Sequence, residues 1–191
     1  MNDTKLSRGE GRARIFQAAA EIVYERGLEK AQTRMVTERA QVGRGLLNHY
    51  FKWPELRAAA WETLFQAAVS DLWRAGEAPA AAMDRFVSEA FTKEARLFWR
   101  LWIEAERLAP ADAPIRAALT RIRRQLRERL VEVLQAGAQA GVWTIQDAQT
   151  TAIRLEALRD GLAGLIMAED PDMDNARAQA LLKHQFIKEL G

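Results

Sequence analysis

Five prolines divide this chain into long segments in which apolar residues recur with a helical period. The prolines stand at positions 54, 79, 110, 114 and 171, so most of the chain is free of the residue that interrupts helices. In the longest segment, Ile115, Leu119, Ile122 and Leu126 fall three or four residues apart, which places them on one helix face. No segment shows the strict alternation of a half-buried strand. The sequence therefore predicts an all-α protein of about nine helices.

The ends of these helices can be placed from local signals. Gly27 and Gly141 stand where a left-handed residue closes a helix, and Pro54 suits a first helical turn. Thr144 and Asp147 resemble a capping box at the start of a late helix. The expected helices cover residues 12–26, 33–40, 44–50, 54 to about 76, 80–92, 94–108, 115–140, 146–168 and 174–189.

Composition removes several classes of protein. The 191 residues include no cysteine, and no apolar run reaches the length of a transmembrane helix or resembles a signal peptide, so we expect a cytoplasmic protein without disulfides or a membrane partner. Its two histidines, His49 and His184, lie far apart, so no metal site and no cofactor are predicted. Residues 1–57 hold 11 Lys and Arg against 7 Asp and Glu, whereas residues 58–191 hold 17 against 19. This asymmetry indicates either a small anion-binding head or random scatter.

The segment 33–50 has the dimensions of a DNA-binding helix-turn-helix, with a supporting helix before it. Small residues at its second helix, Gly43 and Gly45, would allow close approach to a duplex. Arg44, Asn48 and His49 could reach phosphates or base edges, because arginine matches guanine and asparagine matches adenine. The apolar back of the helix would dock on its supports through Val42, Leu47, Tyr50 and Phe51.

These residues resemble the TetR family of one-component transcriptional regulators over about residues 12–60. The resemblance rests on Arg14-Ile15, Ala18-Ala19, Gly27, Val36, Ala40, Val42 and the pattern Gly45-x-Leu47-x-x-x-Phe51. The stretch "GLLNHYF" is most similar to the choline-responsive BetI branch, and "FWRLWIEAER" and "RLEALRDGLAGL" resemble the ligand-binding body of that branch more loosely. The chain departs from the family at Gln41, where the turn usually carries glycine, so strain or a different turn is expected. The family's capping threonine aligns with Gln32, and Thr33 is expected to take over the cap.

The resemblance implies a DNA-binding domain over residues 1–52 and a ligand-binding and dimerisation domain over residues 53–191. It implies a regulator that responds to a small-molecule effector and binds a near-palindromic double-stranded DNA operator as a homodimer. Because the family favours repressors, a repressor is expected. The residues expected to contact DNA are Gln32, Thr33, Arg34, Gly43, Arg44, Gly45, Asn48, His49 and Lys52.

Two further sets of residues are candidates in the body. The first could line an effector pocket or simply fill the core: Trp61, Phe65, Phe91, Phe98, Trp99, Trp102 and Glu104. An aromatic cage with a carboxylate would favour a cationic ligand. The second could form the dimer interface or pack within one chain: Arg154, Leu158, Gly161, Leu162, Leu165, Leu182 and Phe186.

An arginine run at 121–129 has two interpretations. It could be a second DNA-contacting patch or a solvated face with partners such as Arg124 and Glu128. Two other classes of function compete with a DNA-binding regulator for the whole chain. A helical enzyme finds no support, because no nucleophile elbow, phosphate loop or metal cluster is present. A helical adaptor without DNA binding stays open, and a monomer without a specific operator would favour it.

Overall fold

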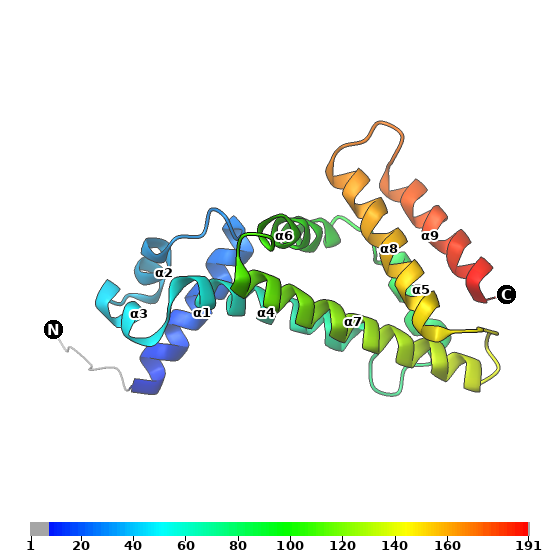
Figure 1. Ribbon diagram of the computed structural model, residues 1–191, viewed down its shortest axis with the longest axis horizontal. Helices are drawn as coiled ribbons and strands as arrows, with labels where there is room; N and C mark the ends of the chain where they lie inside the picture. Colours follow the sequence, from blue (N-terminus) through cyan, green and yellow to red (C-terminus); the bar gives the residue numbers. More distant parts are fainter. Residues whose placement is uncertain (1–7, 191) are drawn as a thin grey trace. The chain divides into compact units, whose positions relative to one another are not determined.

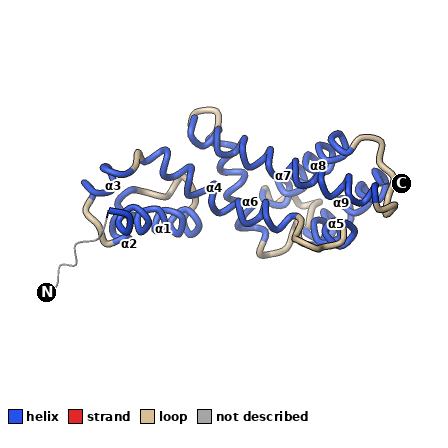
Figure 2. The backbone as a smooth tube through the Cα atoms, turned by 90° about the horizontal axis from the view of Figure 1, so that it is seen from below, coloured by secondary structure: helices blue, strands red, loops and turns tan. Residues whose placement is uncertain are grey.

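The structure is a computed structural model that describes residues 8–190. Every regular element in that range is an α-helix, as Figure 2 shows. In chain order the helices are α1 (Arg8–Arg26), α2 (Thr33–Ala40), α3 (Arg44–Tyr50), α4 (Trp53–Leu72), α5 (Pro79–Ser88), α6 (Ala95–Leu108), α7 (Ala113–Gln139), α8 (Ala148–Met167) and α9 (Asn175–Leu190) (Figure 1). This confirms the all-α prediction, with nine helices in the described part.

Helix ends follow some of the predicted signals, but α4 ends at Leu72 instead of near residue 76, and α5 ends at Ser88 instead of residue 92. Gly27 and Gly141 have the positive φ expected of closing glycines, at 83° and 69°. The capping box at Thr144 is wrong, because Asp147 is the N-cap of α8 and its carboxylate accepts the backbone N–H of Gln149 at 3.0 Å. Aspartate is as good a cap as threonine, and here it stands directly before the helix. Every helix in residues 8–190 is too short or too polar to cross a lipid bilayer.

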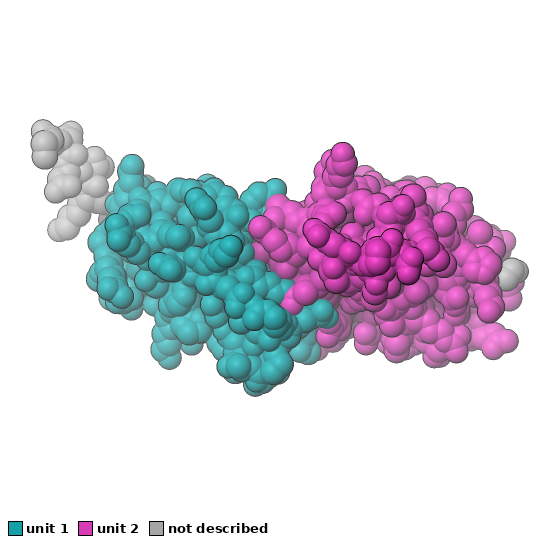
Figure 3. Space-filling model, turned by 90° about the horizontal axis from the view of Figure 1, so that it is seen from above, with its two compact units in different colours: residues 1–66, 104–120 teal, residues 67–103, 121–191 magenta. Residues whose placement is uncertain are grey.

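The chain divides into two compact units, which Figure 3 colours separately. Unit 1 consists of residues 1–66 and 104–120, and unit 2 of residues 67–103 and 121–191. Helices α4, α6 and α7 therefore each contribute residues to both units. The predicted boundary between residues 52 and 53 separates a DNA-binding from a ligand-binding domain. The compact units do not test this division by function, so it stays a prediction.

Unit 1 is built on an apolar face of α1. Ile15 and Val23 on that face are fully buried, and so are Val36 of α2 and Leu47 of α3. Burying a side chain of this size contributes about 1.5–3 kcal/mol. Helices α1, α2 and α3 share this core, which is why α3 holds its position although it has only seven residues.

The turn between α2 and α3 closes on a non-glycine residue. Gln41 adopts the left-handed conformation, with φ 53° and ψ 47°, and its N–H binds the carbonyl of Glu38 while the N–H of Val42 binds that of Thr37. These two bonds form a Schellman closure. The turn thus places the non-glycine residue Gln41 at positive φ, and the Gln41 side chain accepts a hydrogen bond from Arg14 of α1 at 3.3 Å.

In unit 2, one glycine makes room for a tryptophan. A Cβ atom at Gly137 of α7 would overlap the indole ring of Trp143. The indole N–H donates to the carbonyl of Leu134 at 2.8 Å, and the ring meets Phe186 edge to face at 6.2 Å. Trp143 therefore joins the end of α7 to α9, which runs beside α8 (Figure 1).

We predict that Gly137→Ala destabilises the protein by about 1–3 kcal/mol, because the methyl group overlaps Trp143 in a packed region. Helix propensity alone predicts the opposite, a gain of roughly 1 kcal/mol. Urea unfolding of both proteins decides between them. The double variant Gly137→Ala/Trp143→Leu should recover part of the loss, and a more stable single variant would contradict this packing.

We also predict that Gln41→Val destabilises the protein by about 1–2 kcal/mol, since a β-branched residue is strained at positive φ. The matched variant Gln41→Gly should be more stable than Gln41→Val by over about 1 kcal/mol. Chemical denaturation measures both. Equal losses in the two variants would show that the bond to Arg14, and not the backbone conformation, decides stability here.

Candidate functional site

Helix α3 presents its polar residues outward and is held from behind. Leu47 is fully buried, whereas Arg44, Asn48 and His49 are exposed. Nothing lies within 4 Å of a Cβ atom built at Gly43 or Gly45. Packing within the described chain therefore does not require glycine at either position, and the open surface around them is available to a partner.

The start of α2 lacks the side-chain cap that the sequence predicted. Gln32 is the N-cap, and neither it nor Thr33 caps the helix, because Thr33 is already the first helical residue. The expectation that Thr33 takes over the cap is wrong for this reason. The first N–H groups of α2 are left without a side-chain acceptor, which is the arrangement that binds an anion at a helix N-terminus.

Ion pairs fix α2 on α1 and leave other cations at the surface. Arg39 of α2 binds Glu21 and Glu25 of α1, each at 3.0 Å, and this pairing lowers the pKa of Glu25. Arg34 pairs with Glu38 one turn on at 2.7 Å. Lys52 lies 3.8 Å from Glu55 with both side chains largely exposed, an arrangement that contributes little to stability.

Behind these helices, the turn after α1 is held by a carboxylate from α6. Glu104 accepts the backbone N–H of Leu28 at 2.7 Å and of Glu29 at 2.8 Å. A Cβ atom at Gly27 would lie 2.6 Å from the Glu104 carboxylate, so glycine is needed there for this contact as well as for its positive φ. Arg107, one turn further along α6, pairs with Glu29. Sequence reasoning placed Glu104 in a pocket, whereas the structure places it in this turn of unit 1.

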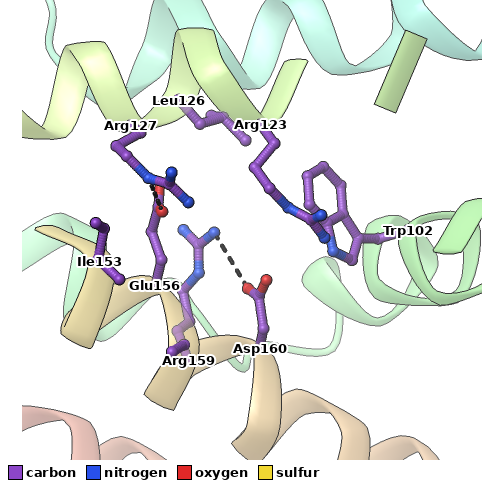
Figure 4. A pocket seen from close by; sticks show the side chains of 9 residues that line it. Trp102, Arg123, Leu126, Arg127, Ile153, Glu156, Arg159 and Asp160 are labelled. Atoms are coloured by element: carbon purple, nitrogen blue, oxygen red, sulfur yellow. Dashed lines mark hydrogen bonds and ion pairs between the residues drawn. The ribbon is translucent and has the colours of Figure 1, made fainter. Parts of the chain in front are cut away.

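The aromatic candidates do not gather in one place. Trp61 and Phe65 pack against each other in unit 1, with ring centroids 4.4 Å apart. Phe91 and Trp99 stack in unit 2 at 6.5 Å, and the Trp99 N–H donates to the carbonyl of Ala90 at 2.7 Å. Phe98 is 37% exposed. Trp102 alone of the seven candidates lines the cavity drawn in Figure 4.

That cavity lies within unit 2 and encloses about 240 Å³. Its walls come from α6, α7 and α8, and Figure 4 shows charged side chains at its centre. The residues that line it are Trp102, Arg123, Leu126, Arg127, Ile153, Glu156, Ala157, Arg159 and Asp160. Within residues 8–190, no group of three or more His, Asp or Glu residues is placed to hold a metal ion.

The arginine run on α7 is divided between the surface and this cavity. Arg124 pairs with Glu128 at 3.8 Å on the solvated face, as one interpretation of the sequence proposed. Arg127 instead turns inward and binds Glu156 of α8 at 2.7 Å. Glu156 is 93% buried, and burial raises its pKa although Arg127 acts in the opposite direction. Neither interpretation of the sequence placed an arginine of this run in a cavity, because the spacing along one helix does not show which arginines meet α8.

The seven candidates for the dimer interface also differ in burial. Leu162 and Leu182 are buried within the single chain, where α8 and α9 lie side by side. Arg154, Gly161 and Leu165 are exposed, and Leu158 and Phe186 are half-buried. Apolar side chains that the sequence analysis did not select extend this surface: Ile153 is 43%, Leu181 41% and Ile187 61% exposed.

Solved structures similar to this one share the fold at low sequence identity. A TetR transcription regulator from Haloarcula marismortui is 19% identical with a TM-score of 0.76, over 96% of this chain and 100% of that chain. A transcriptional regulator from Saccharomonospora viridis in complex with choline is 18% identical with a TM-score of 0.74, over 92% and 95%. The multidrug binding protein EbrR, complexed with proflavin, is 23% identical with a TM-score of 0.65, over 92% and 99%.

Family models match most of the chain, whereas no curated protein matches it significantly in sequence. The model of bacterial regulatory proteins of the tetR family matches residues 15–52, which contain α2, α3 and most of α1. The model of the BetI-type transcriptional repressor C-terminal region matches residues 79–190, which contain all the residues that line the cavity of unit 2. This chain therefore belongs to the TetR family of DNA-binding transcriptional regulators and is of the BetI-like type.

Proposed function

We propose that this protein is a repressor that binds a near-palindromic operator as a homodimer and is released from it by a small-molecule effector. The observation that carries the proposal is the surface of α3. Arg44, Asn48 and His49 are exposed together on a helix that the buried Leu47 anchors. Exposed polar groups on a rigidly held helix are what major-groove recognition requires.

The residues around this helix suit the same task. Arginine can bind guanine with two hydrogen bonds and asparagine can bind adenine, so Arg44 and Asn48 are proposed to read bases. The open surface at Gly43 and Gly45 lets a duplex approach the start of α3. Gln32, Thr33 and Arg34, at the uncapped start of α2, and Lys52 are proposed to contact phosphates.

The proposed dimer uses the exposed face of α8 and α9. Leu165, Leu181 and Ile187 are each at least 40% exposed, and a Cβ atom at Gly161 or Gly164 would meet nothing within 4 Å. Small residues beside exposed apolar ones allow two helix pairs to approach closely and bury apolar surface. A twofold dimer would carry two heads, which would enter major grooves about one helical turn, roughly 34–36 Å, apart.

The effector part of the proposal rests on the cavity in unit 2 and on the similar structures that hold choline and proflavin. An effector shifts an equilibrium only by its difference in affinity for two states. We propose that movements of α4 and α6 couple effector binding to the DNA-binding helices α1, α2 and α3, which we call the head. Along α6, Trp102 lines the cavity and Glu104, two residues on, holds the turn at Leu28 and Glu29.

We predict that Arg44→Ala and Asn48→Ala each weaken operator affinity about 5- to 150-fold, which corresponds to about 1–3 kcal/mol. The operator is first selected from genomic DNA with the full chain, and binding is measured by fluorescence anisotropy on it and on a scrambled duplex. Arg177→Ala, an equal charge change on α9, should leave affinity unchanged. Sequence-blind, salt-sensitive binding that Arg44→Ala and Asn48→Ala do not alter would contradict the proposal.

We predict that Glu104→Gln loosens the head, because an amide can accept from one of the two backbone N–H groups but not replace both carboxylate oxygens. Hydrogen exchange at residue 28, whose bond to Glu104 is part-buried, should accelerate by about fivefold or more, as expected when a hydrogen bond to a charged group worth about 1–3 kcal/mol is lost. Operator affinity should fall as well. Glu94→Gln, at an exposed position, should change neither, and unchanged exchange in Glu104→Gln would overturn this route of coupling.

A further inference from the structure

At the cavity of unit 2, arginine side chains already cover the aromatic rings that could otherwise bind a cationic ligand. The guanidinium of Arg123 lies 5.4 Å from the centroid of the Trp102 ring. That of Arg159 lies 4.9 Å from the Phe86 ring and 5.3 Å from the Trp99 ring. A quaternary ammonium ion binds by occupying such faces, so here it would have to displace an arginine.

The carboxylates of the cavity are also paired with resident cations. Glu156 accepts from Arg127 Nε at 2.7 Å, and Asp160 lies 3.6 Å from a terminal nitrogen of Arg159 (Figure 4). Three guanidinium groups thus face two carboxylates in the lining. With both carboxylates ionised, the lining has a net charge of +1. Burial raises the pKa of Glu156, and its protonation would make the lining more positive.

Two buried polar atoms at the centre of the cavity have no hydrogen-bond partner within the described residues. They are Nε of Arg159, a donor, and Oδ1 of Asp160, an acceptor whose nearest cation, a terminal nitrogen of Arg159 at 3.6 Å, lies beyond hydrogen-bond distance. Buried polar atoms are hydrogen-bonded in most native proteins, so such a pair points to a missing group. A ligand that satisfies both must accept from a guanidinium and donate to a carboxylate.

Resting on the proposed function of this cavity as the effector site, we propose that the effector is a small organic anion, a carboxylate that also bears a hydroxyl group. Its carboxylate binds the guanidinium groups of Arg159 and Arg127, and its hydroxyl donates to Asp160. Arginine suits this task because its planar fork matches a carboxylate with two hydrogen bonds. Leu126 and Ile153 provide apolar contact for the carbon frame of the ligand.

Four probes of similar size test the charge and the hydroxyl separately: 4-hydroxybenzoate, benzoate, 4-hydroxybenzamide and choline. Binding to the full-length protein is measured by titration calorimetry, and release of the selected operator by fluorescence anisotropy. We expect 4-hydroxybenzoate to bind at least tenfold more tightly than benzoate, 4-hydroxybenzamide or choline, and to release DNA.

Three variants separate direct contacts from general damage. Arg159→Gln should weaken 4-hydroxybenzoate binding at least tenfold, whereas Arg124→Gln, on the solvated face of α7, should not. Asp160→Ala, which removes the acceptor of the ligand's hydroxyl, should remove the preference for 4-hydroxybenzoate over benzoate, a change that a merely structural role would not produce. Melting temperatures of all variants show that each is folded.

The outcomes distinguish this inference from the proposed function. Tight choline binding that survives Arg159→Gln, with release of DNA, would overturn the anionic effector and leave the effector-controlled repressor in place. Failure of both carboxylates to bind would also overturn the inference. Absence of a specific operator would instead count against the proposed function, because operator selection is carried out before any probe is added.

Discussion

The carboxylate of Glu104 connects segments of unit 1 that lie 75 and 76 residues apart in the chain. It accepts the two backbone N–H groups at the turn that follows α1, and the chain provides glycine at position 27 so that it can approach. A buried backbone donor without a partner is costly, so this acceptor from α6 stabilises the turn between α1 and α2, in addition to the shared apolar core and the ion pairs of Arg39. The DNA-binding helices therefore depend on a residue from the part of the chain that also forms the cavity wall.

A second set of contacts holds the charged side chains that line the cavity of unit 2. Arginines 123, 127 and 159 line the cavity of unit 2, where they cover aromatic rings or pair with carboxylates. Buried ion pairs contribute little net stability, because desolvation offsets their attraction. Their presence in the cavity lining fits the proposed selection of a ligand by charge and distinguishes this cavity from a cage of uncovered aromatic rings.

Much of the local structure could be predicted. The apolar period of residues 115–134 predicted α7, and the positive φ of Gln41 followed from its place in the turn. Errors arose where several polar residues competed for one role. Asp147 caps α8 in place of Thr144, and Thr33 does not cap α2 because the helix already includes it. Capping depends on a difference of one residue, which periodicity does not resolve.

The sequence by itself determined the helices, the helix-turn-helix and the family, because these depend on the period of apolar residues and on short motifs that are continuous in the chain. Only the tertiary structure decided which polar residues act together. Glu104 lies at the turn after α1 and not in the cavity, and Arg127 faces inward while Arg124 does not. The reason is physical: a residue's role in a cavity depends on neighbours brought from distant segments, and neither the spacing nor the composition of one helix specifies them.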